Sequence, residues 1–210
     1  MKGNYNITCV LTYNKTVWGN FTMHRNDRIF KMVTAAMLCA IGIIIPMICP
    51  KISIEPASFT LASHVALFLA MFLSPKITLA VWFGTTLGFQ LTGMPPVVVM
   101  RAASQIVFAM LGAVWLQKDP HLLQTKKGTA LFALVTGVVH GFMEIIAVLP
   151  FYFSGSLSEA NYQKGFLISV FLLVGVGTVV HSIVDFAIAR VVYQPVSKMS
   201  QIKRISTIAQ

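Results

Sequence analysis

An arginine inside a long apolar stretch is the strongest chemical signal in this sequence. The run Met94–Leu116 is apolar and long enough to cross a bilayer, and Arg101 lies within its first third. A charge at such a depth costs at least about 2.5 kcal/mol on insertion scales, and it marks a candidate functional site. A guanidinium stays charged and can bind a carboxylate through two parallel hydrogen bonds. Arg101 therefore predicts a site that recognises an anionic group.

Four further polar side chains lie in apolar stretches at spacings that can bring them near Arg101. Gln105 follows Arg101 by one helical turn, His140 and Glu144 are one turn apart on another stretch, and His64 lies in a third. Apolar walls, aromatic rings and a few polar groups are the ingredients of a small-molecule site. We expect these five residues to bind a small, flat, anionic or zwitterionic solute.

The same residue types also admit structural and catalytic interpretations. Arg101 and Glu144 could tie two helices together as an ion pair, and His181 could pair with Asp185 four residues later; the roles of His181 and Asp185 stay open. His140 and His181 could ligate a haem, or the His-x-x-x-acid pairs a metal. Because HExxH and GxSxG motifs are absent from the sequence, we expect no enzyme, no cofactor and no metal.

The composition is that of an integral membrane protein. Hydrophobic residues make up 56% of the chain and charged residues 10%, with a mean hydropathy of +0.77, whereas soluble domains carry about 25% charged residues. The net charge of +10 comes from basic residues clustered in loops, and no segment is polar enough to form a face for nucleic acid. The three cysteines show neither CxxC spacing nor a disulfide framework.

Six apolar stretches predict an all-α fold, a compact bundle of six transmembrane helices in one membrane domain at residues 29–193. The stretches are Val33–Cys49, Leu61–Ser74, Ile77–Leu91, Met94–Leu116, Thr129–Phe153 and Phe166–Tyr193. The segment Pro50–Thr60 is too polar and too rich in proline for a membrane helix, and it is long enough to fold over the mouth of the bundle. Residues 1–28 are predicted to be a polar, unstructured leader or the result of a start assigned too early, and residues 194–210 a basic cytoplasmic tail.

The distribution of basic residues predicts the orientation. One set of helix ends carries most of the lysines and arginines, whereas the other set carries Lys51 and Lys164. By the positive-inside rule, both termini are cytoplasmic. This orientation puts Arg101 in the outer third of the membrane, His140 near the midplane and Asp185 deeper still. We therefore expect the site to open to the outside.

The first apolar stretch carries a motif that points to a family. Ala36 and Ala40 stand four residues apart on one face, which lets another helix approach closely. In this setting, the chain from Arg28 to Tyr193 resembles the S-component, or substrate-binding subunit, of an energy-coupling factor (ECF) vitamin transporter. The Ala36–Ala40 pair is similar to the AxxxA motif with which these proteins dock on a shared coupling subunit. The resemblance implies high-affinity vitamin capture outside the cell, with a transmembrane coupling subunit and two ATPase subunits as partners.

Within this family, the run Pro56–Pro75 and the sequence PPVVVMRAASQ around Arg101 look like the niacin type. Nicotinate offers one carboxylate for Arg101 and a pyridine nitrogen for a donor such as His140 or Gln105. Riboflavin, pantothenate and a pyridoxine-like vitamin remain alternatives. A stand-alone secondary transporter is disfavoured because the two halves of the chain show no inverted repeat.

Overall fold

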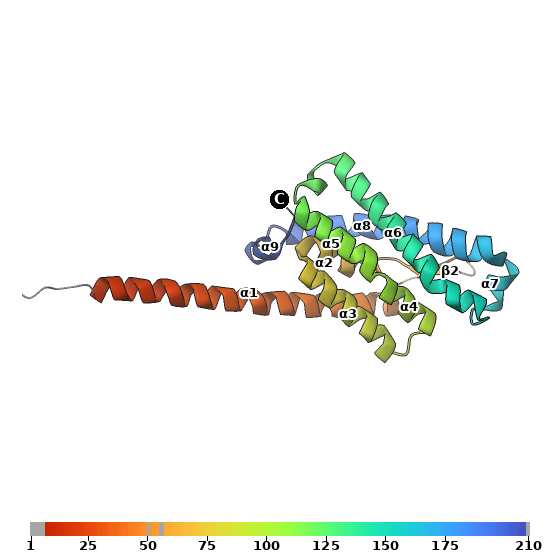
Figure 1. Ribbon diagram of the computed structural model, residues 1–210, viewed down its shortest axis with the longest axis horizontal. Helices are drawn as coiled ribbons and strands as arrows, with labels where there is room; N and C mark the ends of the chain where they lie inside the picture. Colours follow the sequence, from red (N-terminus) through yellow and green to blue (C-terminus); the bar gives the residue numbers. More distant parts are fainter. Residues whose placement is uncertain (1–6, 50, 55–56, 209–210) are drawn as a thin grey trace, which may run out of the picture.

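The computed structural model describes residues 7–49, 51–54 and 57–208, with side chains from 27–49 and 59–208. In these ranges the protein is a bundle of helices with one two-stranded hairpin (Figure 1). The elements are α1 (Ile7–Ile48), β1 (Lys51–Ile54), β2 (Ala57–Thr60), α2 (Val65–Leu73), α3 (Pro75–Leu91), α4 (Pro96–Ser104), α5 (Ile106–Lys118), the 3-10 turn η1 (Leu122–Gln124), α6 (Lys126–Phe153), α7 (Glu159–Gln163), the π-helical segment η2 (Leu167–Val176), α8 (Gly177–Val196) and α9 (Ser200–Ile205).

The described helices include four that are long and apolar enough to cross a membrane: Asp27–Ile48, Pro96–Lys118, Lys126–Phe153 and Leu167–Val196. The predicted second and third spans are also helical, as α2 and α3, but they have only 9 and 17 residues. Large apolar side chains cover the outside of the bundle, among them Phe142 and Phe171. An apolar surface of this extent suits lipid rather than water. The chain is a multi-pass, mainly α-helical membrane protein.

Helix α2 forms the centre of the bundle. All its residues except Leu69 are buried, and it contacts α1, α3, α5 and α8. A helix that is apolar all round needs such complete burial. Ser74 separates α2 from α3 and caps the latter, accepting a hydrogen bond from the Ile77 backbone N–H at 3.3 Å, while Pro75 occupies the first helical position. This one-residue break turns α3 back along α2, so the two helices pack side by side.

Two segments differ from the sequence-based prediction. The segment 50–60, expected only not to be a membrane helix, contains an antiparallel hairpin, with Lys51 opposite Thr60. Its alternating K-I-S-I and A-S-F-T sequences have the period of a strand. The all-α class therefore needs this one addition. The predicted leader is helical from Ile7 onward as part of α1. No proline precedes Pro46 in that helix to interrupt it.

The C-terminal segment packs against the bundle rather than trailing from it. The Thr207 backbone N–H donates to the Phe72 carbonyl at 3.0 Å, and its hydroxyl donates to the Leu73 carbonyl at 2.7 Å. These bonds satisfy carbonyls at the end of α2 that have no partner within the helix. Arg204 of α9 lies 3.6 Å from Asp27 of α1. The start of the membrane part of α1 and the C-terminal helix therefore share one end of the bundle, opposite α7 (Figure 1).

Candidate functional site

A cavity of about 320 Å³ lies among α1, β2, the start of α2 with the turn before it, α3, α4, α6 and α8. Its polar lining residues are Thr60, Ser63, His64, Thr85, Arg101, Gln105, Glu144 and His181. The rest of the wall is mainly apolar and includes Phe59, Phe89 and Val98. Cavities that bind small molecules have volumes of about 300–1,000 Å³. This cavity is at the small end of that range, so it suits a compact ligand.

Arg101 and Glu144 form an ion pair across the wall of the cavity. The Arg101 Nε–H donates to Glu144 Oε2 at 2.6 Å, and Nη2 lies 2.6 Å from the same oxygen. The Thr178 hydroxyl also donates to Oε2, at 3.2 Å. Glu144 is almost fully buried, whereas 26% of the Arg101 side chain is exposed. No described residue bonds Arg101 Nη1, so one edge of the guanidinium remains available to an anion in the cavity.

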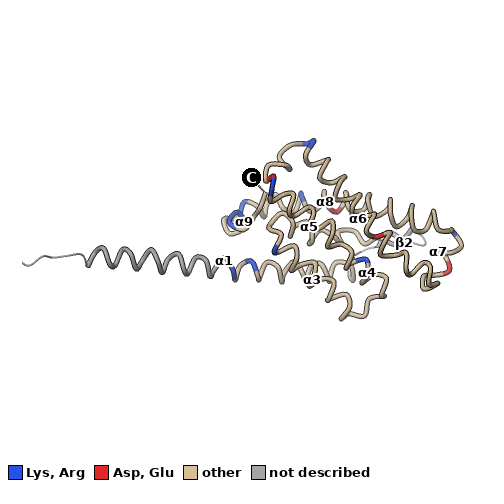
Figure 2. Tube along the Cα trace, in the orientation of Figure 1, with Lys and Arg blue, Asp and Glu red and all other residues tan. Residues whose placement is uncertain are grey.

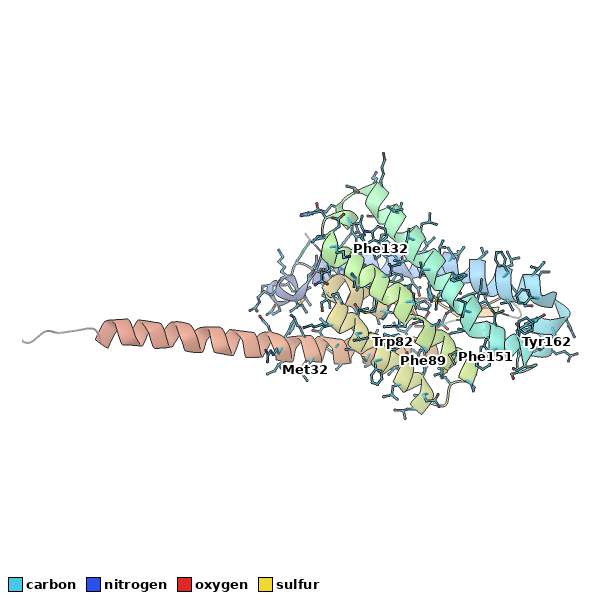
Figure 3. All side chains as sticks on the ribbon, in the orientation of Figure 1. Met32, Trp82, Phe89, Phe132, Phe151 and Tyr162 are labelled. Carbon is cyan, nitrogen blue, oxygen red and sulfur yellow. The ribbon has the colours of Figure 1, made fainter. Side chains whose placement is uncertain are left out.

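A break in the helix positions Arg101 and Gln105. Helix α4 ends at Ser104, and α5 begins at Ile106, so Gln105 sits at the junction. The Trp82 indole N–H, from α3, lies within hydrogen-bonding distance of the Ala102 and Ala103 carbonyls, at 3.1 and 3.0 Å. Those carbonyls lie next to the break, where the regular bond pattern is interrupted. Trp82, labelled in Figure 3, therefore holds the junction from the α3 side.

A buried aspartate holds the turn that carries His64. Asp185 of α8 is fully buried, and its two carboxylate oxygens accept bonds from the backbone N–H groups of Ala62 and His64, each at 2.8 Å. Ala62 has a φ of +66°, a left-handed conformation that costs a residue with a side chain about 1–2 kcal/mol. His64 Nδ1 also lies 3.0 Å from Asp185 Oδ2. The carboxylate thus fixes both the strained turn and the orientation of the His64 ring.

His181 joins this cluster from α8. Its Nε2 lies 3.0 Å from the Ser63 hydroxyl and 3.3 Å from Asp185 Oδ2. Its ring is 5.0 Å from that of His64 and 5.5 Å from that of Phe59, between centroids. The ring of Phe59 also packs closely on Gly177 of α8. Strand β2 is therefore seated on α8 beside the cavity.

His140 lies behind the cavity wall. It is fully buried and stacks on Phe108, with ring centroids 4.0 Å apart, while its Nδ1 lies 3.3 Å from the Ser182 hydroxyl. Its Nε2 is 3.4 Å from Glu144 Oε1, but the approach lacks hydrogen-bond geometry, and Nε2 has no hydrogen-bond partner among the described residues. The rings of His140 and His64 meet edge to face at 4.6 Å.

Four of the five predicted site residues, namely Arg101, Gln105, Glu144 and His64, line the cavity together, and His140 contacts two of them from behind. His181 lines the cavity although the sequence assigns it no role. Its spacing to Asp185 signals a polar pair, but nothing in the sequence shows which way the pair faces.

Comparison with known proteins identifies the family. No family model matches the chain, and no solved structure matches it. Among curated proteins, the niacin transporter NiaX of Lactococcus lactis subsp. cremoris is 40% identical over 169 residues, which cover 80% of this chain and 75% of that protein. The chain belongs to the NiaX family. This finding confirms the resemblance to a niacin-type S-component, and a relative named as a transporter agrees with the expectation that the chain is not an enzyme.

Proposed function

We propose that this NiaX-family protein is the vitamin-binding S-component of an ECF-type importer and that its ligand is nicotinate. The observation that carries the proposal is the available guanidinium edge of Arg101 in a cavity of about 320 Å³. The ligand carboxylate binds Nη1 of Arg101, while Glu144 holds Nε and Nη2 on the other side. An arginine held in this way binds a carboxylate with little loss of side-chain freedom.

The remaining wall accounts for a pyridine ring. Gln105 lines the cavity, and no described residue bonds its side-chain amide, so the amide N–H can donate to the ring nitrogen. Phe59 and Phe89 provide apolar surface for the ring faces. Riboflavin is much larger than nicotinate and carries no carboxylate for Arg101, pantothenate offers no ring to the aromatic wall, and a pyridoxine-like vitamin carries no carboxylate. The geometry therefore favours nicotinate among the vitamins considered.

The ligand is tested by titrating the purified protein with a vitamin panel and following tryptophan fluorescence, because Trp82 supports the junction at Gln105. Nicotinate is expected to bind at least tenfold more tightly than nicotinamide, since hydrogen bonds to a charged group contribute about 1.5–3 kcal/mol and those between neutral groups about 1 kcal/mol. Equal affinity for the acid and the amide would show that Arg101 does not recognise a ligand carboxylate.

We further propose that the chain crosses the membrane six times with both termini in the cytoplasm. The proposal rests on the charge distribution: lysines and arginines lie mainly around the end that carries α9 (Figure 2), whereas Lys164 directly follows α7. Ser156→Cys and Ser200→Cys variants, made without the native cysteines, test it with a membrane-impermeant maleimide on intact cells. Labelling is expected at position 156 and not at position 200, and the reverse pattern would refute the orientation.

The proposed docking face on the coupling subunit is the outward side of α1. Ala36 and Ala40 are exposed there, beside the exposed side chains of Met37 and Ile41. Two small residues one turn apart allow close approach of a partner helix. Ala36→Trp is expected to abolish nicotinate uptake in cells that carry the coupling subunit and two ATPases, while nicotinate binding by the purified protein is unchanged. Loss of binding in this variant would mean that the face serves the bundle itself.

A further inference from the structure

We propose that His64, His140 and Glu144 form a binding site for a divalent transition-metal ion of the Zn²⁺ class in the inner wall of the cavity. A ring nitrogen from each histidine and a carboxylate oxygen of Glu144 all lie within 4.8 Å of one another. Two histidines and one glutamate are the protein ligands of zinc sites that keep a fourth position open. The sequence led us to expect no metal because the HExxH motif is absent. Two of the three ligands, His140 and Glu144, nevertheless stand one turn apart on α6, and the third, His64, comes from the start of α2.

The separation of two candidate ligand atoms matches coordination. His140 Nε2 and Glu144 Oε1 are 3.4 Å apart without hydrogen-bond geometry. Two ligands of a tetrahedral zinc ion, each at about 2.0–2.1 Å, stand about 3.3–3.4 Å from one another. His140 Nε2 is also a fully buried polar atom without a hydrogen-bond partner among the described residues. Such an atom needs an explanation, and an ion beside it supplies one.

The outer partners of the two histidines are those of metal ligands. His64 Nδ1 faces Asp185 Oδ2 at 3.0 Å, and His140 Nδ1 faces the Ser182 hydroxyl at 3.3 Å. A metal-bound histidine usually donates its other ring N–H to a carboxylate, a backbone carbonyl or a water molecule, which fixes the tautomer; the Ser182 hydroxyl oxygen can accept this N–H as a water molecule does. With Nδ1 engaged in both rings, Nε2 is the nitrogen left to ligate. No described residue bonds His64 Nε2, so it too is available.

The charges of the cluster agree with a metal that binds together with an anion. Arg101 carries one positive charge, and Glu144 and Asp185 carry one negative charge each. A divalent ion leaves the cluster with one excess positive charge, which a monocarboxylate in the cavity neutralises. Because charges within a membrane are costly unless they are balanced, this arrangement favours joint binding. In this respect the inference rests on the proposed function, since nicotinate supplies the anion.

The experiment uses the full-length protein in detergent, treated with EDTA and then titrated with CoCl₂. Co²⁺ in water absorbs visible light only weakly, whereas four-coordinate Co²⁺ in a tetrahedral site absorbs much more strongly and at longer visible wavelengths, so the appearance of this strong absorption reports the site. We expect one Co²⁺ per chain, loss of the absorption in His140→Gln, and no change in the control His121→Gln, which alters an exposed histidine outside the cluster. Should His140→Gln not fold, Ser182→Ala provides a milder test, with an expected 10–100-fold loss of Co²⁺ affinity.

Nicotinate binding by the EDTA-treated and the Co²⁺-loaded protein separates this inference from the proposed function. Tighter nicotinate binding in the loaded protein supports both. If the wild type shows no absorption from bound Co²⁺, the metal site is overturned, and a water molecule or a proton satisfies His140 Nε2 instead. If that protein still binds nicotinate, the proposed function stands. Co²⁺ binding that His140→Gln abolishes, without nicotinate binding in either state, supports the metal site and refutes the proposed ligand.

Discussion

Replacing Arg101 by alanine should damage both stability and binding, and a second substitution should separate the two effects. The single change leaves the Glu144 carboxylate, only 2% exposed, with the Thr178 hydroxyl as its one hydrogen-bond donor among the described residues. Breaking a buried ion pair by removing one partner costs about 3–5 kcal/mol. Because a quarter of the Arg101 side chain is exposed, we expect the lower end, about 3 kcal/mol.

The double variant Arg101→Ala/Glu144→Gln removes the unpaired charge and should recover most of this loss. In a chain of this size, 1 kcal/mol shifts the melting temperature by about 2–4 °C, so Arg101→Ala should melt about 6–12 °C below the wild type and the double variant within a few degrees of it. The double variant should still fail to bind nicotinate, because the guanidinium is absent. Both measurements are made after EDTA treatment, so that no metal replaces the missing charge.

The matched control is Arg204→Ala, which breaks the exposed pair with Asp27. Exposed pairs contribute about 0–1 kcal/mol, so this variant should melt close to the wild type. If the double variant is no more stable than Arg101→Ala, Glu144 is not destabilised by losing its partner. If it binds nicotinate with wild-type affinity, Arg101 does not anchor the ligand.

Three further outcomes follow from contacts around the site. A Cβ at Gly141 would lie 2.6 Å from the Gly175 carbonyl oxygen, so the Gly141→Ala variant should melt at a lower temperature than the wild type and bind nicotinate more weakly. A Cβ at Gly137 would make ordinary contacts at 3.4 Å and beyond, so the control variant Gly137→Ala should match the wild type in both assays. Asp185→Asn replaces an oxygen that accepts a hydrogen bond from the strained turn with an N–H donor, so we expect the free energy of unfolding to fall by about 1–3 kcal/mol, measured by thermal unfolding. The control variant Asp119→Asn, at an exposed position just before η1, should show no measurable change. Thr207→Val removes the hydroxyl that bonds the Leu73 carbonyl and should cost about 1 kcal/mol without altering nicotinate affinity; an altered affinity would mean that the tail acts on the site through α2.

The helix positions and the main polar pair could be predicted because both follow from local rules. Apolar runs ended by proline and glycine mark the six helical stretches, and the basic loops predict relative depth. The predicted depths place Arg101 and Glu144 at similar levels on different helices, which left an ion pair as one interpretation, and the structure shows the two side chains in contact at 2.6 Å. The helix break at Gln105 could not be predicted in this way. It depends on an indole from α3 that bonds the carbonyls beside the break, and no local pattern specifies that contact.

Asp185 shows why depth along a helix is an incomplete guide to a site. From its position one turn beyond His181, it should lie too deep to meet the cavity. The chain before α2 instead turns within the bundle, and Asp185 accepts the backbone N–H groups of Ala62 and His64 at the start of that helix. The positive end of α2 adds to the stabilisation of the carboxylate. With its oxygens occupied by these donors, Asp185 is poorly placed to pass a proton onward. Its contacts hold the His64 ring beside the cavity, so a fully buried acid that does not line the cavity still shapes the cavity wall.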